Sequence, residues 1–187
     1  MNGKSLSLLF AAVGGALILI AAPQTWVTVA FGGSEELSYE LSGQDVAPAL
    51  VALGSAVLAA VAVIALVPFA GRLVFSVLGL LAAGGAAFGV WAALGSSAGQ
   101  LGEWALIEAG VQVAGFDTAG LTASWSWLPW LTAAAALLAA FGFAFALLTS
   151  RSWSQTGQRY ERRPHDTETR SGQWDALSEG DDPTVAS

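Results

Sequence analysis

Apolar and polar stretches alternate along the chain, and four of the apolar stretches are long enough to cross a membrane. They cover about residues 5–22, 46–67, 73–94 and 127–149. A helix of about twenty apolar residues spans the roughly 30 Å hydrocarbon core of a bilayer. The pattern therefore predicts an integral membrane protein of mainly α class, with a four-helix transmembrane domain over residues 1–150.

The first apolar stretch has two interpretations. It follows Lys4, is short and ends in small residues, which is also typical of a secretory signal peptide. Pro23 directly after Ala22 is poorly suited to a cleavage site, and three more apolar stretches follow. We therefore expect this segment to be retained as the first transmembrane helix.

Two longer polar segments, residues 23–45 and 95–126, separate the first helix from the second and the third from the fourth. In the former, residues 26–31 are rich in β-branched and aromatic residues, and residues 37–41 alternate apolar with polar after a Gly-Gly turn signal. This favours a small β-hairpin, with an irregular loop as the alternative. Because an isolated two-stranded ribbon is only marginally stable, we expect it to pack on the second segment.

The second segment, residues 95–126, contains weaker signals. It opens with a Gly- and Ser-rich stretch that we expect to be flexible. Residues 103–109 are compatible with a short helix, and residues 121–125 with a strand. The two segments together predict a small cap that contains β-structure.

The helices that follow these segments are predicted to start in the same way. Asp45 is expected to be the N-cap of the second helix, with Pro48 in its first turn. A carboxylate accepts from the first backbone N–H groups, and proline lacks an N–H that would otherwise stay unsatisfied. Ser126 and Pro129 repeat this spacing before the fourth helix.

Composition agrees with a membrane protein. Hydrophobic residues make up 55% of the 187 positions and charged residues 11%, and the mean hydropathy is +0.61. Soluble chains carry roughly 25% charged residues. No basic face of the kind that binds nucleic acid is present, so we expect no nucleic-acid partner.

The distribution of charge predicts the orientation. Lys4, a tight turn over Pro68–Arg72 and the arginines from Arg151 onward fall on one side of the four-helix arrangement. Residues 23–45 and 95–126 carry acids and no base. Because short loops rich in Lys and Arg stay in the cytoplasm, we predict a multi-pass plasma-membrane protein with both termini cytoplasmic and the cap outside.

The cytoplasmic tail, residues 151–187, is too polar to bury a core and is predicted to be largely disordered. Its first part combines arginines with aromatic residues that favour the anionic inner leaflet: Arg151, Trp153, Arg159, Tyr160, Arg162 and Arg163. Its second part is compatible with one or two helical turns between Ser171 and Gly180. The tail motif predicted to dock a cytosolic partner consists of Trp174, Asp175, Leu177, Asp182 and Pro183.

Residue types that carry chemistry are scarce. The absence of cysteine excludes disulfides and thiolate metal sites. The single histidine, His165, falls in the tail, and Ser55 and Ser76 have no base nearby in sequence. We expect no catalytic, cofactor or metal site and interpret the protein as a non-enzyme. Four acids of the first outer segment form a solvated face or, alternatively, a cation or substrate site: Glu35, Glu36, Glu40 and Asp45.

Six of the eight tryptophans map to the outer side of the predicted arrangement. They are Trp26, Trp91, Trp104, Trp125, Trp127 and Trp130. One interpretation is a belt at the water–lipid boundary together with packing beneath the outer segments. The alternative is an outer aromatic pocket that stacks a flat ligand such as an indole.

Short motifs in a fixed order resemble those of the tryptophan-associated transmembrane protein family of actinobacteria. These are Thr25–Val29 after the first helix, Leu41-Ser42-Gly43 before the second, and Trp127-x-Pro129-Trp130 opening the fourth. The tail adds Arg151-x-Trp153, Arg159-Tyr160, Trp174–Leu177 and Gly180-x-Asp182-Pro183-Thr184. The resemblance covers nearly the whole chain. It implies a four-span plasma-membrane protein whose gene tends to lie among tryptophan-biosynthesis genes, and it supplies no catalytic residues.

Two functions follow as hypotheses. The first is an accessory or scaffold protein that binds a membrane partner through small-residue helix faces (Gly79, Ala83, Gly85 and Gly89) and a cytosolic partner through the tail motif. The second is permeation or sensing of tryptophan, indole or a precursor through the outer aromatic cluster. Ion-coupled transport is disfavoured, because the interiors of the four predicted helices contain no ionisable residue.

Overall fold

The computed structural model describes residues 3–31, 38–110 and 120–150. All of them belong to the first of the two units into which the chain divides, Met1–Trp153 and Ser154–Ser187. The predictions for the tail concern residues outside this described part.

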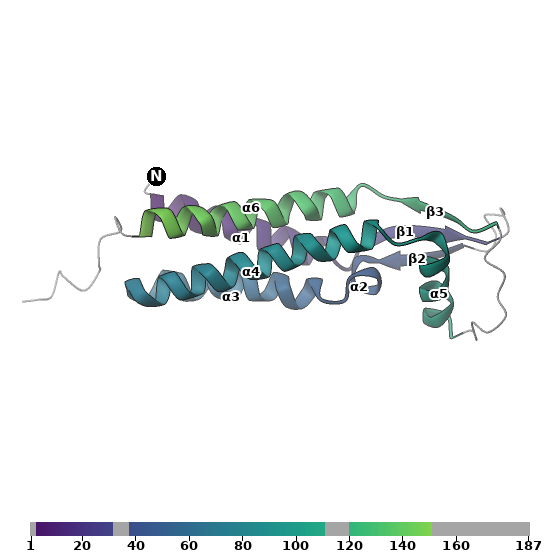
Figure 1. The fold of residues 1–187 in the computed structure, drawn as a ribbon, viewed down its shortest axis with the longest axis horizontal. Helices are drawn as coiled ribbons and strands as arrows, with labels where there is room; N and C mark the ends of the chain where they lie inside the picture. The colour runs from purple at the N-terminus through teal and green to yellow at the C-terminus, as the bar shows by residue number, and fades with distance from the viewer. Residues whose placement is uncertain (1–2, 32–37, 111–119, 151–187) are drawn as a thin grey trace, which may run out of the picture. The chain divides into compact units, whose positions relative to one another are not determined.

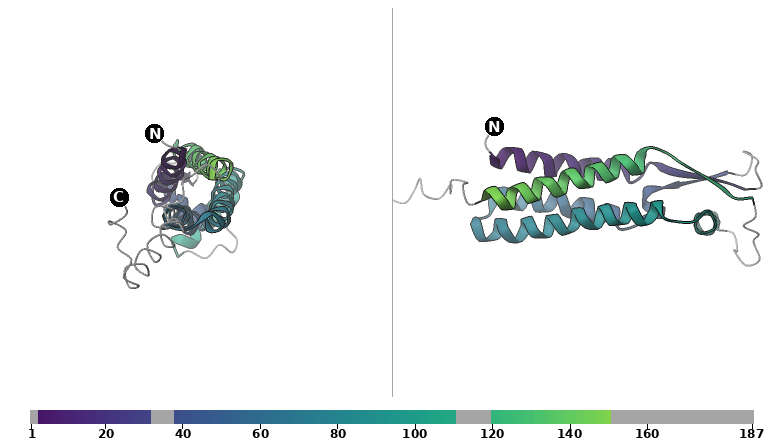
Figure 2. Two further views of the ribbon diagram at one scale, coloured as in Figure 1. Left: turned by 90° about the vertical axis from the view of Figure 1, so that its left-hand side faces the viewer. Right: turned by 45° about the horizontal axis from the view of Figure 1, so that its top comes forward.

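Four helices pack side by side as a bundle (Figure 1). They are α1 (Gly3–Ala21), α3 (Leu50–Leu66), α4 (Phe69–Leu94) and α6 (Leu128–Thr149). Contacts join α1 to α3, α3 to α4, α4 to α6 and α6 back to α1, so each helix has two neighbours in a closed ring (Figure 2). Helices α1, α4 and α6 are long and apolar enough to span a membrane, and α3 is a shorter apolar helix of 17 residues.

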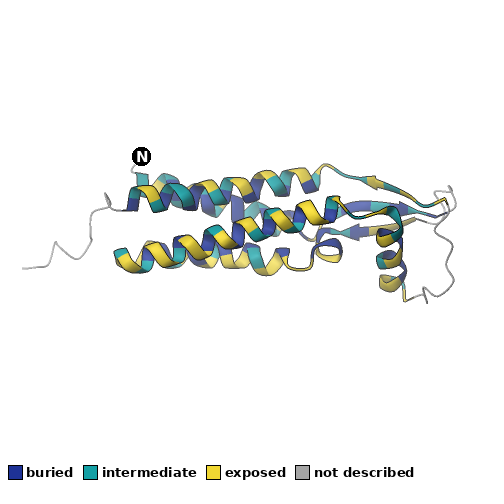
Figure 3. Ribbon diagram, in the orientation of Figure 1, coloured by how far each residue is buried: buried dark blue, intermediate teal, exposed yellow. Residues whose placement is uncertain are grey.

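Many large apolar side chains lie on the outside of the bundle, and most of the residues buried inside it are small, although Ile64 and Phe143 are also buried there. Leu81 on α4 and Leu148 on α6 are 66% and 82% exposed, whereas Ala83 and Ala139 on the same two helices are fully buried (Figure 3). Helices in lipid associate through small residues that let their backbones approach, because lipid tails solvate large apolar side chains. The bundle thus has the side-chain distribution of a lipid-embedded domain.

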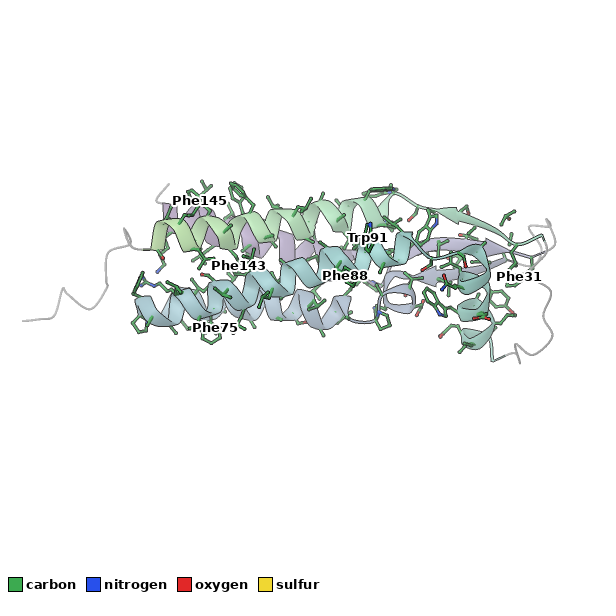
Figure 4. The ribbon with its side chains drawn as sticks, viewed as in Figure 1. Phe31, Phe75, Phe88, Trp91, Phe143 and Phe145 are labelled. Atoms are coloured by element: carbon green, nitrogen blue, oxygen red, sulfur yellow. The ribbon has the colours of Figure 1, made fainter. Side chains whose placement is uncertain are left out.

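The closest approach between helices is along α1 and α6. A methyl group on Gly14 would lie 2.5 Å from the carbonyl oxygen of Ala135, and one on Gly142 would lie 2.6 Å from the backbone nitrogen of Ala11. Only glycine allows backbones to come this near. Between α4 and α6, the ring of Phe143 occupies the position that a side chain on Gly79 would need (Figure 4).

The small-residue face expected on the third span is therefore used only in part. Gly79 and Ala83 are buried inside the bundle. Gly85 faces Leu53 at ordinary contact distance, and a side chain on Gly89 would meet no atom within 4 Å. The Gly85–Gly89 pair does not mediate a close helix contact within the described residues.

A three-stranded antiparallel sheet lies at the end of the bundle where α1 ends and α6 begins (Figure 1), hereafter the sheet end. Its strands are β1 (Thr25–Ala30), β2 (Ser38–Ser42) and β3 (Thr122–Trp125), in the order β2-β1-β3. The predicted hairpin and the predicted strand of the second outer segment are both confirmed. Helix α5 (Ala98–Glu108) contacts all three strands and buries Leu101 and Ala105 in the core that they share.

The prediction of a flexible opening to residues 95–126 is wrong. Helix α5 begins at Ala98, five residues before the helix expected from sequence. Ser97 is its N-cap, with its Oγ accepting from the Gln100 backbone N–H at 3.3 Å. The Gln100 side chain accepts in return from the Ser97 backbone N–H at 2.9 Å. This reciprocal capping box stabilises a helix start in a stretch rich in Gly and Ser.

The second predicted helix is interrupted, and Asp45 is not its N-cap. A short helix α2 (Gly43–Val46) precedes α3, and Ala47 has left helical geometry with φ −144° and ψ 74°. The cause is Pro48, because the residue before a proline is disfavoured in the helical region. Asp45 instead accepts from both the backbone N–H and the hydroxyl of Ser42, each at 2.7 Å.

The start of α6 is supported by Ser126, since its Oγ accepts from the Leu128 backbone N–H at 3.4 Å.

The predicted turn over Pro68–Arg72 is shorter than expected. Only Val67 and Pro68 link α3 to α4, and α4 starts at Phe69, four residues earlier than predicted. Arg72 therefore lies in the first turn of α4, where its N–H donates to the carbonyl of Pro68 at 3.0 Å. Its side chain is buried, with 5% of its surface exposed. We call this the Arg72 end of the bundle.

Candidate functional site

Trp26, the first of the six outer tryptophans, is a core residue. It is fully buried, and its indole N–H donates to the carbonyl of Ala21, the last residue of α1, at 3.0 Å. It is the extra residue of a β-bulge, since Thr25 pairs with Ser42 and Val27 with Leu41. The bulge bends the chain where β1 leaves α1, and Trp26 fills the junction.

Gly43 provides the space that Trp26 needs. A methyl group at Gly43 would lie 2.5 Å from Cε2 of the indole ring and 2.8 Å from its Nε1. Carbon atoms in contact are normally about 3.5–4.0 Å apart. The Trp26 side chain thus joins the sheet to α1 and α2, because it bonds Ala21 at the end of α1 and packs on Gly43 of α2.

Trp104 and Trp125 are half-buried and pack against the same core. Trp104 comes from α5 and Trp125 from β3, where it pairs with Val27 of the central strand. The interpretation of packing beneath the outer segments describes these two residues and Trp26.

The other three tryptophans point away from the core. Trp91 is 71% exposed near the end of α4, and Trp127 and Trp130 are 68% and 65% exposed at the start of α6. Phe88 lies one turn before Trp91 on α4, with ring centres 5.8 Å apart (Figure 4). Amphipathic rings at the ends of apolar helices are typical of the water–lipid boundary.

The six tryptophans therefore occupy three environments rather than one. One is buried at the junction of sheet and bundle, two are half-buried in the cap, and three face outward at the level where α4 ends and α6 begins. The described residues do not bring them together around a common space.

The two described acids of the first outer segment, Glu40 and Asp45, form local hydrogen bonds. Glu40 accepts from the hydroxyl of Thr25 at 2.9 Å, and Asp45 accepts from Ser42 as described above. Among residues 3–31, 38–110 and 120–150, no group of three His, Cys, Asp or Glu side chains is placed to hold a metal ion. Glu35 and Glu36 lie outside the described residues.

The serines considered from sequence have different surroundings. Ser55 is on the exposed side of α3. Ser76 is buried inside the bundle one turn after Arg72, and its hydroxyl has no hydrogen-bond partner within the described part of the chain. Neither serine faces a described histidine or carboxylate, because the four bundle helices contain neither residue type.

Two of the predicted sites lie outside the described residues. They are the lipid-contacting basic segment between Arg151 and Arg163 and the tail motif between Trp174 and Pro183. Both stay predictions from sequence.

Comparison with protein families identifies the chain. Residues 8–184 match the family described as tryptophan-associated transmembrane protein, so the chain belongs to that family. Comparison with curated proteins and with solved structures gave no match. The family membership confirms the resemblance drawn from the short motifs, and its description agrees with the apolar helices of the bundle.

Proposed function

We propose that this member of the tryptophan-associated transmembrane family is a non-enzymatic accessory or scaffold protein of the plasma membrane. It crosses the bilayer four times, retains α1, keeps both termini in the cytoplasm and binds protein partners. One observation carries the proposal. The bundle interior is filled by small side chains together with a few large ones such as Ile64 and Phe143, and the outer faces of its helices carry large apolar side chains.

The closed interior favours a scaffold over a transporter. Between the Arg72 end and the sheet end, the four helices contain no Asp, Glu, Lys or Arg apart from Lys4 and Arg72 themselves. Ionisable residues within a membrane usually mark ion or substrate pathways. The Phe143 ring packs on Gly79 and fills the space between α4 and α6, about two turns from Arg72 toward the sheet end.

The orientation follows from where the charges lie. Lys4 and Arg72, the two described bases, are both at the Arg72 end. The described acids are all in the cap: Glu40, Asp45, Glu103 and Glu108. By the positive-inside rule, the Arg72 end faces the cytoplasm and the cap lies outside.

The orientation is testable because the chain has no cysteine, so any introduced cysteine is unique. In intact cells, a membrane-impermeant maleimide should label Glu108→Cys, which is exposed on α5, and should not label Ser187→Cys until the cells are opened. The reverse pattern would exclude the proposed orientation.

The scaffold role is tested by purifying the full chain from native membranes after cross-linking and identifying what accompanies it. The variant Trp174→Ala/Leu177→Ala should lose the cytosolic partner, whereas the matched control Val185→Ala should keep it. Retention of every partner by the double variant would remove the docking role of the tail.

Permeation or sensing of tryptophan or indole is the weaker hypothesis. It needs aromatic side chains that face a common space, whereas the six outer tryptophans occupy three environments. No specific observation favours it over the scaffold role. A change in intrinsic fluorescence on adding indole to the purified protein would restore it.

A further inference from the structure

The C-terminal end of helix α3 receives cations from both of its neighbours. Lys4 on α1 donates from Nζ to the carbonyl oxygen of Ala65 at 3.4 Å. Arg72 on α4 donates from Nε to the carbonyl oxygen of Val67 at 3.0 Å. Ala65 lies in the last turn of α3, and Val67 directly follows it.

These carbonyls need partners from outside their own helix. The last four C=O groups of an α-helix have no intrahelical donor. Val67 is extended, with φ −86° and ψ 156°, so α3 cannot continue, and Pro68 brings no N–H. Water satisfies such groups where they are exposed, whereas Arg72 is buried and reaches the Val67 carbonyl from within the protein.

The two donors also suit the electrostatics of the helix end. The C-terminus of a helix carries a partial negative charge, which a nearby cation stabilises. Arg72 is buried and its hydrogen bond is short, whereas the Lys4 bond is longer and exposed. The larger contribution is therefore expected from Arg72.

We propose that Arg72, assisted by Lys4, is a positioning residue that caps α3 from the neighbouring helices and joins α1, α3 and α4 at this end. This role of Arg72 at the end of α3 goes beyond the proposed function and does not rest on it. The charge of Arg72 contributes to orientation, and its Nε–H additionally fixes the end of the shortest bundle helix.

Two substitutions separate the hydrogen bond from the charge. In glutamine the side-chain nitrogen is bonded to Cδ, as Nε is in arginine, so Arg72→Gln keeps a neutral donor in the same place. Arg72→Met keeps a flexible apolar side chain and no donor. Arg72→Lys keeps the charge and moves the donor. Leu73→Met, at the next and exposed position, is the matched control.

The measurement is hydrogen exchange of the full chain in nanodiscs, read on peptides that cover residues 61–67. Arg72→Met should raise exchange there about tenfold or more, and it should lower the Tm by about 4–8 °C. Arg72→Gln should recover most of the protection, and Leu73→Met should match the wild type. Lys4→Met should have a smaller effect than Arg72→Met.

Two results would overturn the proposal that Arg72 caps α3. In the first, Arg72→Met and Leu73→Met give the same exchange at the end of α3. In the second, Arg72→Gln behaves like Arg72→Met while Arg72→Lys behaves like the wild type, which would leave charge as the only contribution. If Arg72→Met fails to insert into the membrane, the comparison of Arg72→Gln with Arg72→Lys decides whether the hydrogen bond to the end of α3 or the charge alone is responsible.

Discussion

Replacing Gly43 with alanine should weaken the attachment of the sheet to the bundle. The added methyl group would lie 2.5 Å from Cε2 of Trp26, about 1 Å inside normal carbon contact. The ring is fully buried, so it has no solvent to move into. The substitution therefore forces the indole away from Gly43 and away from the carbonyl of Ala21 that it now bonds at 3.0 Å.

The expected loss of stability has two contributions. Overpacking a well-filled core costs about 1–3 kcal/mol. Losing the indole hydrogen bond costs about another 1 kcal/mol. A total of about 2–4 kcal/mol corresponds to a fall in Tm of about 5–15 °C for a chain of this size. Because Gly43 does not have a positive φ, alanine is compatible with its backbone and the cost arises from the ring contact.

The assay is thermal unfolding of the purified protein in detergent, with near-UV circular dichroism to follow the indole environment. Gly84→Ala is the control, because a side chain on Gly84 would meet no atom within 4 Å in the middle of α4. It should leave the Tm unchanged or raise it. In the background of Trp26→Phe, whose ring is smaller, Gly43→Ala should cost less, and a double-mutant cycle measures the difference. Equal Tm values for Gly43→Ala and Gly84→Ala would refute the reasoning.

Three further predictions concern the helices. The pair Gly3→Cys/Thr149→Cys should form a disulfide on mild oxidation, since the two Cβ atoms would be 4.0 Å apart, and a gel under non-reducing conditions shows it. Gly142→Ala should destabilise the protein by at least about 1–3 kcal/mol because its methyl group meets α1 backbone, whereas Gly89→Ala should not, as measured by thermal unfolding. Ser97→Ala should cost about 1 kcal/mol and speed hydrogen exchange in the first turn of α5 without changing the strands.

The features of the fold that could be predicted are those with a strong local signal. The uncharged runs around α1, α4 and α6 have about the length that a bilayer requires, so they could be recognised from sequence as membrane spans. The hairpin could be predicted because a run rich in β-branched and aromatic residues at 26–31 is followed by an alternating run at 37–41. Both signals depend on residues close together in sequence.

The features that could not be predicted depend on partners far away in sequence. The sequence does not distinguish the buried Trp26 from the outward-facing members of the six outer tryptophans, because its neighbours are equally apolar. Its burial arises from contacts with Ala21 and with Gly43, which comes from another element. The burial of Arg72 likewise depends on α4 starting only two residues, Val67 and Pro68, after the end of α3. When these helix ends are unknown, a charged residue that follows a proline and a glycine within five positions is typical of a turn.

The interruption of the second helix is the exception, because its cause is local. The sequence predicts Pro48 in a first turn that begins at Asp45. The same proline disfavours a helical Ala47, and Ser42 competes for the Asp45 carboxylate through two hydrogen bonds. The sequence predicts a cap at Asp45 alone, whereas the observed cap begins at Ser42, and the contact of Gly43 with Trp26 favours that arrangement.

Distances along the helices bear on whether the short helix α3 completes a crossing. Trp91 and Arg72 are nineteen residues apart on α4, or about 28 Å at 1.5 Å per residue, which is close to the thickness of a hydrocarbon core. Trp130 and Thr149 give the same separation on α6. Leu53 faces Gly85, so the start of α3 at Leu50 is on roughly the level of Phe88, about 5 Å below Trp91. The non-helical residues 47–49 then fall at the tryptophan level. This placement supports the proposal that the 17 residues of α3 form a fourth crossing.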